Sequence, residues 1–299
     1  MPTAFIRARP PRIVQSRQNA RVKELRAGFA QSAKTEHGRI AIEGEHLLLE
    51  ALAARLDIPV VFVRSGSENL LSRLSLPESA DVLSLPPDVF LSAVSTESPQ
   101  GIAALVKPSE FTLDQVFARS SAPLIVIAAG LQDPGNLGTL IRSSEAFGAA
   151  GLITLPGTVS LWNQKALRAS AGSVFRLPVV SAREDEAFAS LASHQIASLA
   201  AVATGGQPIT AHDLTLPTAF ILGNEGSGIP PGILGQVTAR VTIATPGPVE
   251  SLNAAVAGSI LLYEAARQRA GEASRQRANG LGAPSFAPAV GAKGGKGKS

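Results

Sequence analysis

Three short polar segments of this 299-residue chain carry residues that could bind a ligand or take part in a reaction. They are QDPGNLGTLIRSSEAFG (132–148), GNEGSGIPPG (223–232) and TPGPVESLN (245–253), and each follows a short apolar stretch typical of a buried strand. Backbone donors and acceptors exposed at the carboxyl ends of parallel strands form a ligand-binding crevice. Together the segments predict a site for a polar, ring-bearing molecule.

The composition of these segments narrows the class of ligand. They contain no GxxxxGK[ST] sequence, and GNEGSG does not fit GxGxxG. Lysine is also absent from them, which argues against binding of a nucleoside triphosphate. An uncharged or zwitterionic nucleoside is favoured. The chain has no cysteine and four histidines without HxxxH or HxH spacing, so we expect neither thiolate chemistry nor a metal site.

Segment 132–148 also carries local signals of a helix. A turn at Pro134-Gly135 precedes Asn136, a competent helix N-cap, and an apolar helical pattern follows. Gly138 would lie in the first turn, where the missing side chain lets another group approach the backbone closely.

The elements that must position these segments alternate along the chain. From residue 123 onwards the apolar stretches are LIVIAAGL, GLITL, IASLAAVA, TAFILG and RVTIA. Each is short and bounded by turn residues, which predicts parallel strands covered on both faces. Before residue 108, strand candidates at 39–42, 59–64 and 100–108 alternate with amphipathic helical patterns.

This pattern predicts an α/β fold in two domains. A small α/β domain spans 1–107, a linker with a short amphipathic helix spans 108–122, and a parallel-sheet domain spans 123–270. The last segment, 271–299, is rich in Gly, Ala, Pro and Ser and is expected to be a disordered basic tail. The composition, 45% hydrophobic and 17% charged, is that of a globular protein.

Positive charge is concentrated at the two ends of the chain. Residues 1–40 carry nine Lys or Arg against two Glu, and residues 265–299 carry seven against one, so the body between them is acidic. Basic ends predict contacts with a polyanion. The N-terminal segment is the stronger candidate because Val22, Leu25 and Phe29 have helical spacing, whereas a solubilising role is equally open for the tail.

The ends also bear on location. The start of the chain lacks the apolar region of a secretory signal, and the longest apolar run is too short to span a bilayer, so we expect a cytoplasmic protein. An Arg-rich organellar transit peptide is the alternative.

The motifs themselves resemble a known family. NLGTLIRSSEAFG, FILGNEGSGI and VESLNAAVA are similar, in this order, to the three signature motifs of the SpoU/TrmH family of RNA ribose 2′-O-methyltransferases. QNARVKELRAGFAQ with IAIEGEHLLLEAL resembles the RNA-binding domain common in that family, and KALRASAGSVFRLPV resembles its middle segment. The resemblance covers about residues 12–270, and the ordered triple motif makes it specific.

The resemblance implies S-adenosyl-L-methionine-dependent methylation of a ribose 2′-hydroxyl in structured RNA. It also implies a SPOUT domain with a deep trefoil knot, a homodimer, and close packing of the helix of small residues that follows Asn253. We expect 23S ribosomal RNA rather than transfer RNA, because minimal transfer-RNA members commonly lack the N-terminal domain. A transfer-RNA methyltransferase, and a non-catalytic RNA-binding or ribosome-assembly factor on the same fold, are the alternatives.

The resemblance further implies roles for individual residues. The catalytic candidates are Asn136, Arg142, Glu225, Ser251 and Asn253. The cofactor-binding candidates are Leu222, Gly223, Asn224, Gly226, Ile243, Leu252 and Asn253. The RNA-binding candidates are Arg17, Asn19, Arg21, Lys23, Lys165 and Arg168, and for the last two a solvated helix face is an equally open alternative. The third motif departs from the family, because Ala244 and Thr245 stand where Pro-Met is common, and we expect a changed pocket shape rather than lost binding.

Physical chemistry restricts what some of these side chains can do. An arginine does not deprotonate in proteins, so we expect Arg142 to stay charged, bind the adjacent phosphate and stabilise the developing alkoxide. Glu145 is expected to be a salt-bridge partner, and capping of a neighbouring helix is the structural alternative for Glu225. Trp162 and Tyr263 are the only Trp and Tyr, so we expect recognition by shape and phosphate rather than an aromatic stacking platform.

Overall fold

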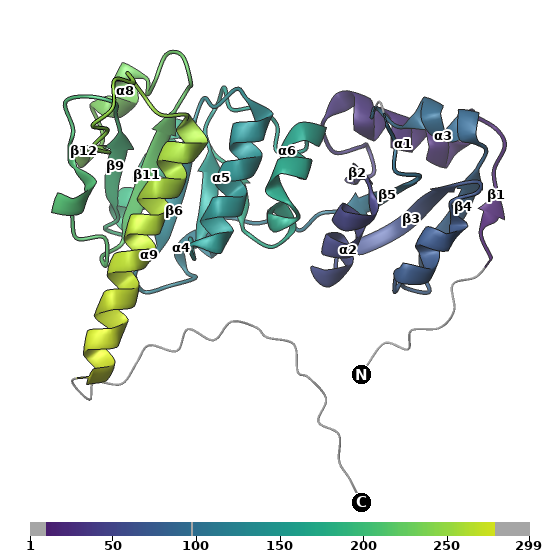
Figure 1. The fold of residues 1–299 in the computed structure, drawn as a ribbon, viewed down its shortest axis with the longest axis horizontal. Helices are drawn as coiled ribbons and strands as arrows, with labels where there is room; N and C mark the ends of the chain where they lie inside the picture. Colours follow the sequence, from purple (N-terminus) through teal and green to yellow (C-terminus); the bar gives the residue numbers. More distant parts are fainter. Residues whose placement is uncertain (1–9, 97, 279–299) are drawn as a thin grey trace, which may run out of the picture.

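The computed structural model describes residues 10–96 and 98–278. Two α/β units, each built on its own sheet, lie side by side along the long axis of the molecule (Figure 1). None of the helices in this part of the chain has the length and apolar composition needed to cross a membrane.

The first unit contains a five-stranded mixed sheet in the order β1-β4-β3-β5-β2. Its strands are β1 (Arg12–Ile13), β2 (Ile40–Glu43), β3 (Asp57–Arg64), β4 (Asp81–Leu85) and β5 (Ile102–Lys107). Its helices are α1 (Ala20–Gln31), α2 (Glu45–Ala53), the 3-10 helix η1 (Glu68–Arg73) and α3 (Pro87–Ala93). Strands β1, β4 and β3 run parallel, whereas β5 is antiparallel to both β3 and β2. The predicted strands are confirmed, and the two-residue β1 had no signal in the sequence.

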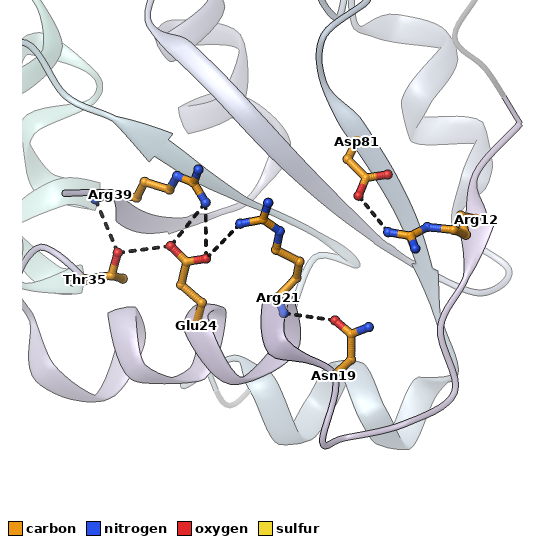
Figure 2. A network of polar contacts seen from close by, with 7 residues as sticks. All are labelled: Arg12, Asn19, Arg21, Glu24, Thr35, Arg39 and Asp81. Atoms are coloured by element: carbon orange, nitrogen blue, oxygen red, sulfur yellow. Dashed lines mark hydrogen bonds and ion pairs between the residues drawn. The ribbon is translucent and has the colours of Figure 1, made fainter. Parts of the chain in front are cut away.

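Helix α1 forms where its apolar spacing predicts it. The side chain of Asn19 caps it by accepting a 2.9 Å hydrogen bond from the N–H of Arg21. Figure 2 shows Glu24, which is buried, accepting hydrogen bonds from Thr35 at 3.1 Å and Arg39 at 3.2 Å, with Arg21 at 3.3 Å. These charge-assisted bonds attach α1 to the segment that leads into β2.

The second unit contains a seven-stranded sheet in the order β10-β12-β9-β11-β6-β7-β8, and all of its strand pairs are parallel. Its strands are β6 (Leu124–Ala129), β7 (Gly151–Thr154), β8 (Val179–Ser181), β9 (Ala197–Ala201), β10 (Gln207–Pro208), β11 (Thr218–Gly223) and β12 (Ala239–Thr242). Its helices are α4 (Leu113–Phe117), α5 (Pro134–Ala146), α6 (Gln164–Ser170), η2 (Ser173–Phe175), α7 (Glu184–Ser193), η3 (Ile209–Ala211), α8 (Pro231–Leu234) and α9 (Ala254–Ala278). The parallel α/β sheet predicted from the apolar stretches is confirmed, while the short β8 and β10 were not predicted.

Strand β6 shows why these strands are continuous apolar runs. Val126 and Ala128 pack into one hydrophobic cluster, and Ile125 and Ile127, which alternate with them, pack into another. Because helices cover both faces of the sheet, both sets of side chains must be apolar.

Helix α9 packs directly on α5 and β11 through small residues. A side-chain Cβ added to Gly258 would lie 2.5 Å from Leu140 and 2.6 Å from Leu222, and the hydroxyls of Ser143 and Ser259 are 2.7 Å apart. Close packing of this helix is therefore confirmed. The helix continues to Ala278, so the beginning of the predicted disordered tail is helical, and the rest of that tail lies outside the described residues.

Helix α6 lies between α5 and the first unit (Figure 1). The side-chain amide of Gln164 donates a 2.9 Å hydrogen bond to the backbone carbonyl of Ala41 in this buried contact. The guanidinium of Arg176 binds Glu50 of α2 and Glu145 of α5. One hydrophobic cluster includes buried residues of both units, so the two sheets are joined by a shared core as well as by these polar contacts.

Candidate active site

The three polar segments meet at one edge of the second sheet. They follow β6, β11 and β12, whose carboxyl ends lie at the same edge in the order β12-β9-β11-β6. A cleft of about 500 Å³ opens there, a volume usual for a ligand pocket. It is lined by residues 201–203, 222–229, 241–243, 245, 250–254, 257 and 261.

A chain of hydrogen bonds joins the three motifs at the cleft. Asn136 Nδ2 donates to Glu225 Oε1 at 2.8 Å, and Asn253 Nδ2 donates to Asn136 Oδ1 at 2.9 Å. Asn253 Oδ1 in turn accepts from the N–H groups of Ala255 at 2.9 Å and Val256 at 3.2 Å, in the first turn of α9. Each amide thus has both ends engaged, which sets its orientation.

Glu225 holds its carboxylate against the segment that precedes α5. Besides Asn136, it accepts hydrogen bonds from the N–H groups of Gln132 at 3.2 Å and Asp133 at 3.3 Å. Burial acts to raise the pKa of Glu225, but these hydrogen bonds outweigh it and hold the pKa below its ordinary value. Glu225 is therefore charged, and its hydrogen bonds hold the segment before α5 in place. This agrees with the alternative that Glu225 caps a neighbouring helix.

The prediction that Asn136 is the N-cap of its helix is wrong. Asp133 is the N-cap, and its Oδ1 accepts a 2.9 Å hydrogen bond from the N–H of Asn136. Pro134 takes the first helical position, where its fixed φ suits a helix and its missing N–H costs nothing. This places Asn136 inside the first turn and leaves its side chain available to Glu225 and Asn253.

Gly138 has the close contact that its position predicts. A Cβ added to it would lie 2.3 Å from the backbone carbonyl oxygen of Ala166, in α6. The group that approaches the backbone here is a neighbouring helix rather than a ligand.

The donor set of the cleft fits a nucleoside without phosphate. All of the predicted cofactor-binding residues line the cleft. Leu222, Ile243 and Leu252 supply apolar walls, and among the described lining residues the charged side chains are Glu225 and Glu250. Carboxylates and backbone groups suit a cationic or zwitterionic ligand, whereas a phosphate would require basic side chains.

Sequence reasoning missed one wall of the cleft. Residues 201–203, at the end of β9, line it although their stretch carries no polar signal. They reach the site because β9 lies between β11 and β12, which only the strand order reveals. Thr245 and Ser251 line the cleft as well.

Arg142 lies on the exposed face of α5 and outside the lining of the cleft. Its guanidinium has no ion-pair partner among residues 10–96 and 98–278. Glu145 is a salt-bridge partner, as expected, but of Arg176, which binds it through Nε at 2.7 Å and Nη2 at 2.9 Å. Arg142 is thus left available for a ligand.

The predicted RNA-binding residues divide between the two units. In the first unit, Asn19 caps α1, Arg17 pairs with Asp88 at 2.7 Å and Arg21 pairs with Glu24 at 3.3 Å. On α6, Lys165 pairs with Asp133 at 2.7 Å.

Two other basic residues of this set are exposed, Lys23 on α1 and Arg168 on α6. Neither has an ion-pair partner in the part of the chain that the structure describes, so these two cations are the more available for phosphate. The described residues also contain no cluster of His, Asp or Glu able to hold a metal ion.

Comparison with known proteins identifies the family. Residues 123–263 match the SpoU rRNA Methylase family, and residues 19–104 match the MRM3-like substrate binding domain. A relative from Bacillus subtilis, named 23S rRNA (guanosine(2553)-2′-O)-methyltransferase RlmP, is 30% identical over 250 residues, covering 84% of this chain and 97% of that protein. The chain belongs to the SpoU rRNA methylase family.

Solved structures of SpoU methyltransferases share the architecture. AviRb from Streptomyces viridochromogenes in complex with the cofactor AdoMet has a TM-score of 0.74 and 25% identity, over 85% of this chain and 99% of that one. An AdoMet-bound rRNA methyltransferase from Sinorhizobium meliloti has a TM-score of 0.74 and 26% identity, over 86% and 97%. The family resemblance predicted from the three motifs is confirmed.

Proposed function

We propose that this SpoU family chain transfers a methyl group from S-adenosyl-L-methionine to a ribose 2′-hydroxyl of 23S ribosomal RNA. The observation that carries the proposal is the chain of hydrogen bonds through Asn136, Glu225 and Asn253, which joins all three motifs beside a cleft of suitable donor chemistry. The relatives with this fold include structures bound to AdoMet.

The chain's own residues then bind and orient the reactants. Residues at the ends of β9, β11 and β12 would hold the cofactor, which would supply an electrophilic methyl group. Transfer would join the methyl carbon to the 2′-oxygen as its bond to sulfur breaks, leaving a thioether and releasing the hydroxyl proton to solvent. Because oxygen, carbon and sulfur must be in line, positioning by the chain's residues contributes strongly to catalysis. Arg142, which is exposed and stays charged, would bind the phosphate beside the target ribose and stabilise the developing alkoxide.

The relatives support ribosomal RNA as the substrate. Besides RlmP, a protein from Streptomyces viridochromogenes named 23S rRNA (uridine(2479)-2′-O)-methyltransferase is 29% identical over 264 residues. The match of residues 19–104 to a substrate-binding domain supports recognition of the RNA by the first unit. We also propose a cytoplasmic location, which is in keeping with this substrate.

We also infer a homodimer and a knotted C-terminal segment. Val256, Ile260 and Tyr263 of α9 are exposed by 48%, 37% and 57%, and a second copy would cover this apolar face. In the sheet, β12 lies on the far side of β9 from β11, whereas α9, the next helix in the chain, packs on β11 and α5. This arrangement supports the trefoil knot implied by the family.

The test is methyl transfer from labelled S-adenosyl-L-methionine to unmodified 23S ribosomal RNA and to transfer RNA. We expect one 2′-O-methylated linkage in 23S RNA, mapped by its resistance to alkaline cleavage. Arg142→Lys should nearly abolish transfer while cofactor binding persists, because a point charge lacks the two-pronged geometry of the guanidinium. Arg119→Lys, at an exposed arginine between α4 and β6, is the matched control.

Two results would overturn the proposal. Near-normal turnover in Arg142→Lys contradicts the role of Arg142. Failure of the wild-type protein to bind the cofactor contradicts the enzyme itself and favours an RNA-binding factor on the same fold.

A further inference from the structure

A second cleft, of about 450 Å³, opens at the carboxyl ends of β7 and β8. Its apolar lining includes Leu155, Pro156, Val159, Leu161 and Trp162. None of the residues that the motifs or the charge pattern single out for catalysis, cofactor or RNA lines it. It lies on the same edge of the parallel sheet as the first cleft, where ligand sites form.

We infer that this second cleft binds one unpaired base of the RNA substrate, and that the base carries an exocyclic amino group. The inference rests on the proposed function, since it assigns a further contact to the same RNA. It is carried by three observations: the hydrogen bonds that attach the cleft wall to the end of β6, the place of the cleft between the first unit and the first cleft, and the chemistry of its lining.

The wall of the second cleft is attached to the segment that carries the active site. Thr158 Oγ1 donates to the carbonyl of Ala128 at 2.9 Å and accepts from the N–H of Gly130 at 3.1 Å. The N–H of Val159 donates to the carbonyl of Leu131 at 2.8 Å. These bonds hold the wall against the end of β6, directly before α5, so a bound base is positioned relative to Asn136.

The second cleft also lies beside the RNA-binding unit. Ser160, one of its lining residues, donates a 2.6 Å hydrogen bond to the carbonyl of Ser32, the residue that ends α1. In the sheet order β9-β11-β6-β7-β8, the first cleft is at β9 and β11 and the second is at β7 and β8. An RNA strand held by the first unit therefore meets the second cleft on its way to the first.

The lining leaves few polar groups free for recognition. The hydroxyls of Thr158 and Ser160 each donate one hydrogen bond and accept another, and those of Thr154 and Ser181 lie 2.8 Å apart and bond each other. Trp162 lines the cleft and is half-buried against the core. Stacking of a base on its indole departs from the sequence-based expectation that no aromatic side chain takes part in recognition.

The exposed charged side chains of the lining are Glu186 and Arg183. The guanidinium of Arg183 is already bound by Asp185. A carboxylate such as Glu186 accepts hydrogen bonds from an exocyclic amino group, which adenine, cytosine and guanine carry and uracil, with only its ring N–H, lacks.

Because Trp162 is the single tryptophan of the chain, its fluorescence reports occupancy of the second cleft directly. The probes are pentaribonucleotides of A, C and U, and a pentamer with the same sugar-phosphate backbone and no bases. We expect saturable quenching by the A and C pentamers, weaker quenching by the U pentamer and none by the abasic one. Equal quenching by the abasic pentamer, or none by any probe, overturns the inference. Neither result depends on methyl transfer.

Variants test the same cleft in the reaction on 23S RNA. Stacking of a base on an aromatic side chain is worth about 1–3 kcal/mol, which is roughly 5- to 150-fold in affinity. We therefore expect Trp162→Ala to raise KM for RNA about tenfold, and Trp162→Phe and Glu186→Ala to raise it less. With the pentaribonucleotides, Glu186→Ala should lose the preference over uracil. Affinity for S-adenosyl-L-methionine should not change, and Glu78→Ala, at an exposed carboxylate of the first unit, should behave as wild type.

These outcomes separate the inference from the proposed function. An unchanged KM in both Trp162→Ala and Glu186→Ala overturns the inference while leaving the methyltransferase intact. Where no methyl transfer is detected, the dissociation constant for 23S RNA from filter binding replaces KM. Glu186 is exposed, so its variant remains informative if Trp162→Ala fails to fold.

Discussion

Replacing Asn136 by aspartate puts a second carboxylate into the hydrogen-bond chain with almost no change of shape. In the native protein Asn136 Nδ2 lies 2.8 Å from Glu225 Oε1, so the variant sets two carboxylates at about that distance. A hydrogen bond to a charged group contributes about 1.5–3 kcal/mol, and the lower value applies because Glu225 is exposed. Repulsion at 2.8 Å in a water-like dielectric adds about 1.5 kcal/mol. The free energy of unfolding should therefore fall by about 3 kcal/mol at pH 7.

The loss should depend on pH in a defined direction. At pH 7, protonating a carboxyl of ordinary pKa costs about 4 kcal/mol, more than the repulsion, so both groups stay charged. Repulsion raises the pKa of the pair above the unfolded value. The variant therefore recovers stability as the pH falls below the ordinary carboxyl range and loses it as the pH rises through the raised pKa. At pH 4 the two groups can share a proton, so we expect a smaller deficit there than at pH 7.

The assay is urea-induced unfolding followed by circular dichroism at pH 7 and pH 4, with three variants. Asn136→Ala removes the hydrogen bonds without adding charge, so its deficit should vary less with pH than that of Asn136→Asp. Asn69→Asp makes the same change at an exposed position of η1 and should have little effect. A deficit in Asn136→Asp that is the same at both pH values, or no larger than that of Asn69→Asp, refutes the reasoning.

Three further predictions concern packing and charge elsewhere. Arg176→Ala leaves two carboxylates facing each other between the units and should lower the free energy of unfolding by about 2 kcal/mol in thermal melts; a loss within error of zero contradicts this. Gly138→Ala meets a backbone carbonyl at 2.3 Å and should cost about 3 kcal/mol, whereas Gly271→Ala, with no atom within 4 Å, should stabilise α9 by about 1 kcal/mol; equal effects refute the contrast. The hydrogen bond from Arg267 lowers the pKa of Glu264 to about 2. The ionised Glu264 therefore contributes to the free energy of unfolding above about pH 4.5, and this contribution is lost as the pH falls towards 2. Glu264→Gln should flatten the acid limb of the stability curve, and an unchanged slope argues against it.

Local sequence patterns determined much of the architecture. The apolar stretches predicted the strands of the second sheet because side chains on both of its faces are buried, which leaves a continuous apolar signal. Turn and polar residues after three of those strands predicted where the ligand cleft would lie, and the absence of lysine there predicted a ligand without phosphate. The cleft observed at that edge has carboxylates and no basic side chain among its described lining residues.

Short elements and exact helix ends were less predictable. Strands β1 and β10 have two residues each, too few to produce a periodic pattern. The N-cap at Asp133 competed with Asn136, since both residue types cap helices, and Pro134 decided between them by occupying the first helical position.

Only the tertiary structure decided which side chains meet. Glu145 pairs with Arg176 rather than with Arg142, its neighbour on the same helix, because α6 and η2 bring Arg176 against α5. The contacts of Asn136 with Glu225 and Asn253, and the second cleft around Trp162, depend on the order of strands in the sheet. Periodicity reports which face of an element is buried, but it carries no information on which element covers that face. Long-range packing determines which element covers that face, and the same packing brings the side chains of the candidate active site together.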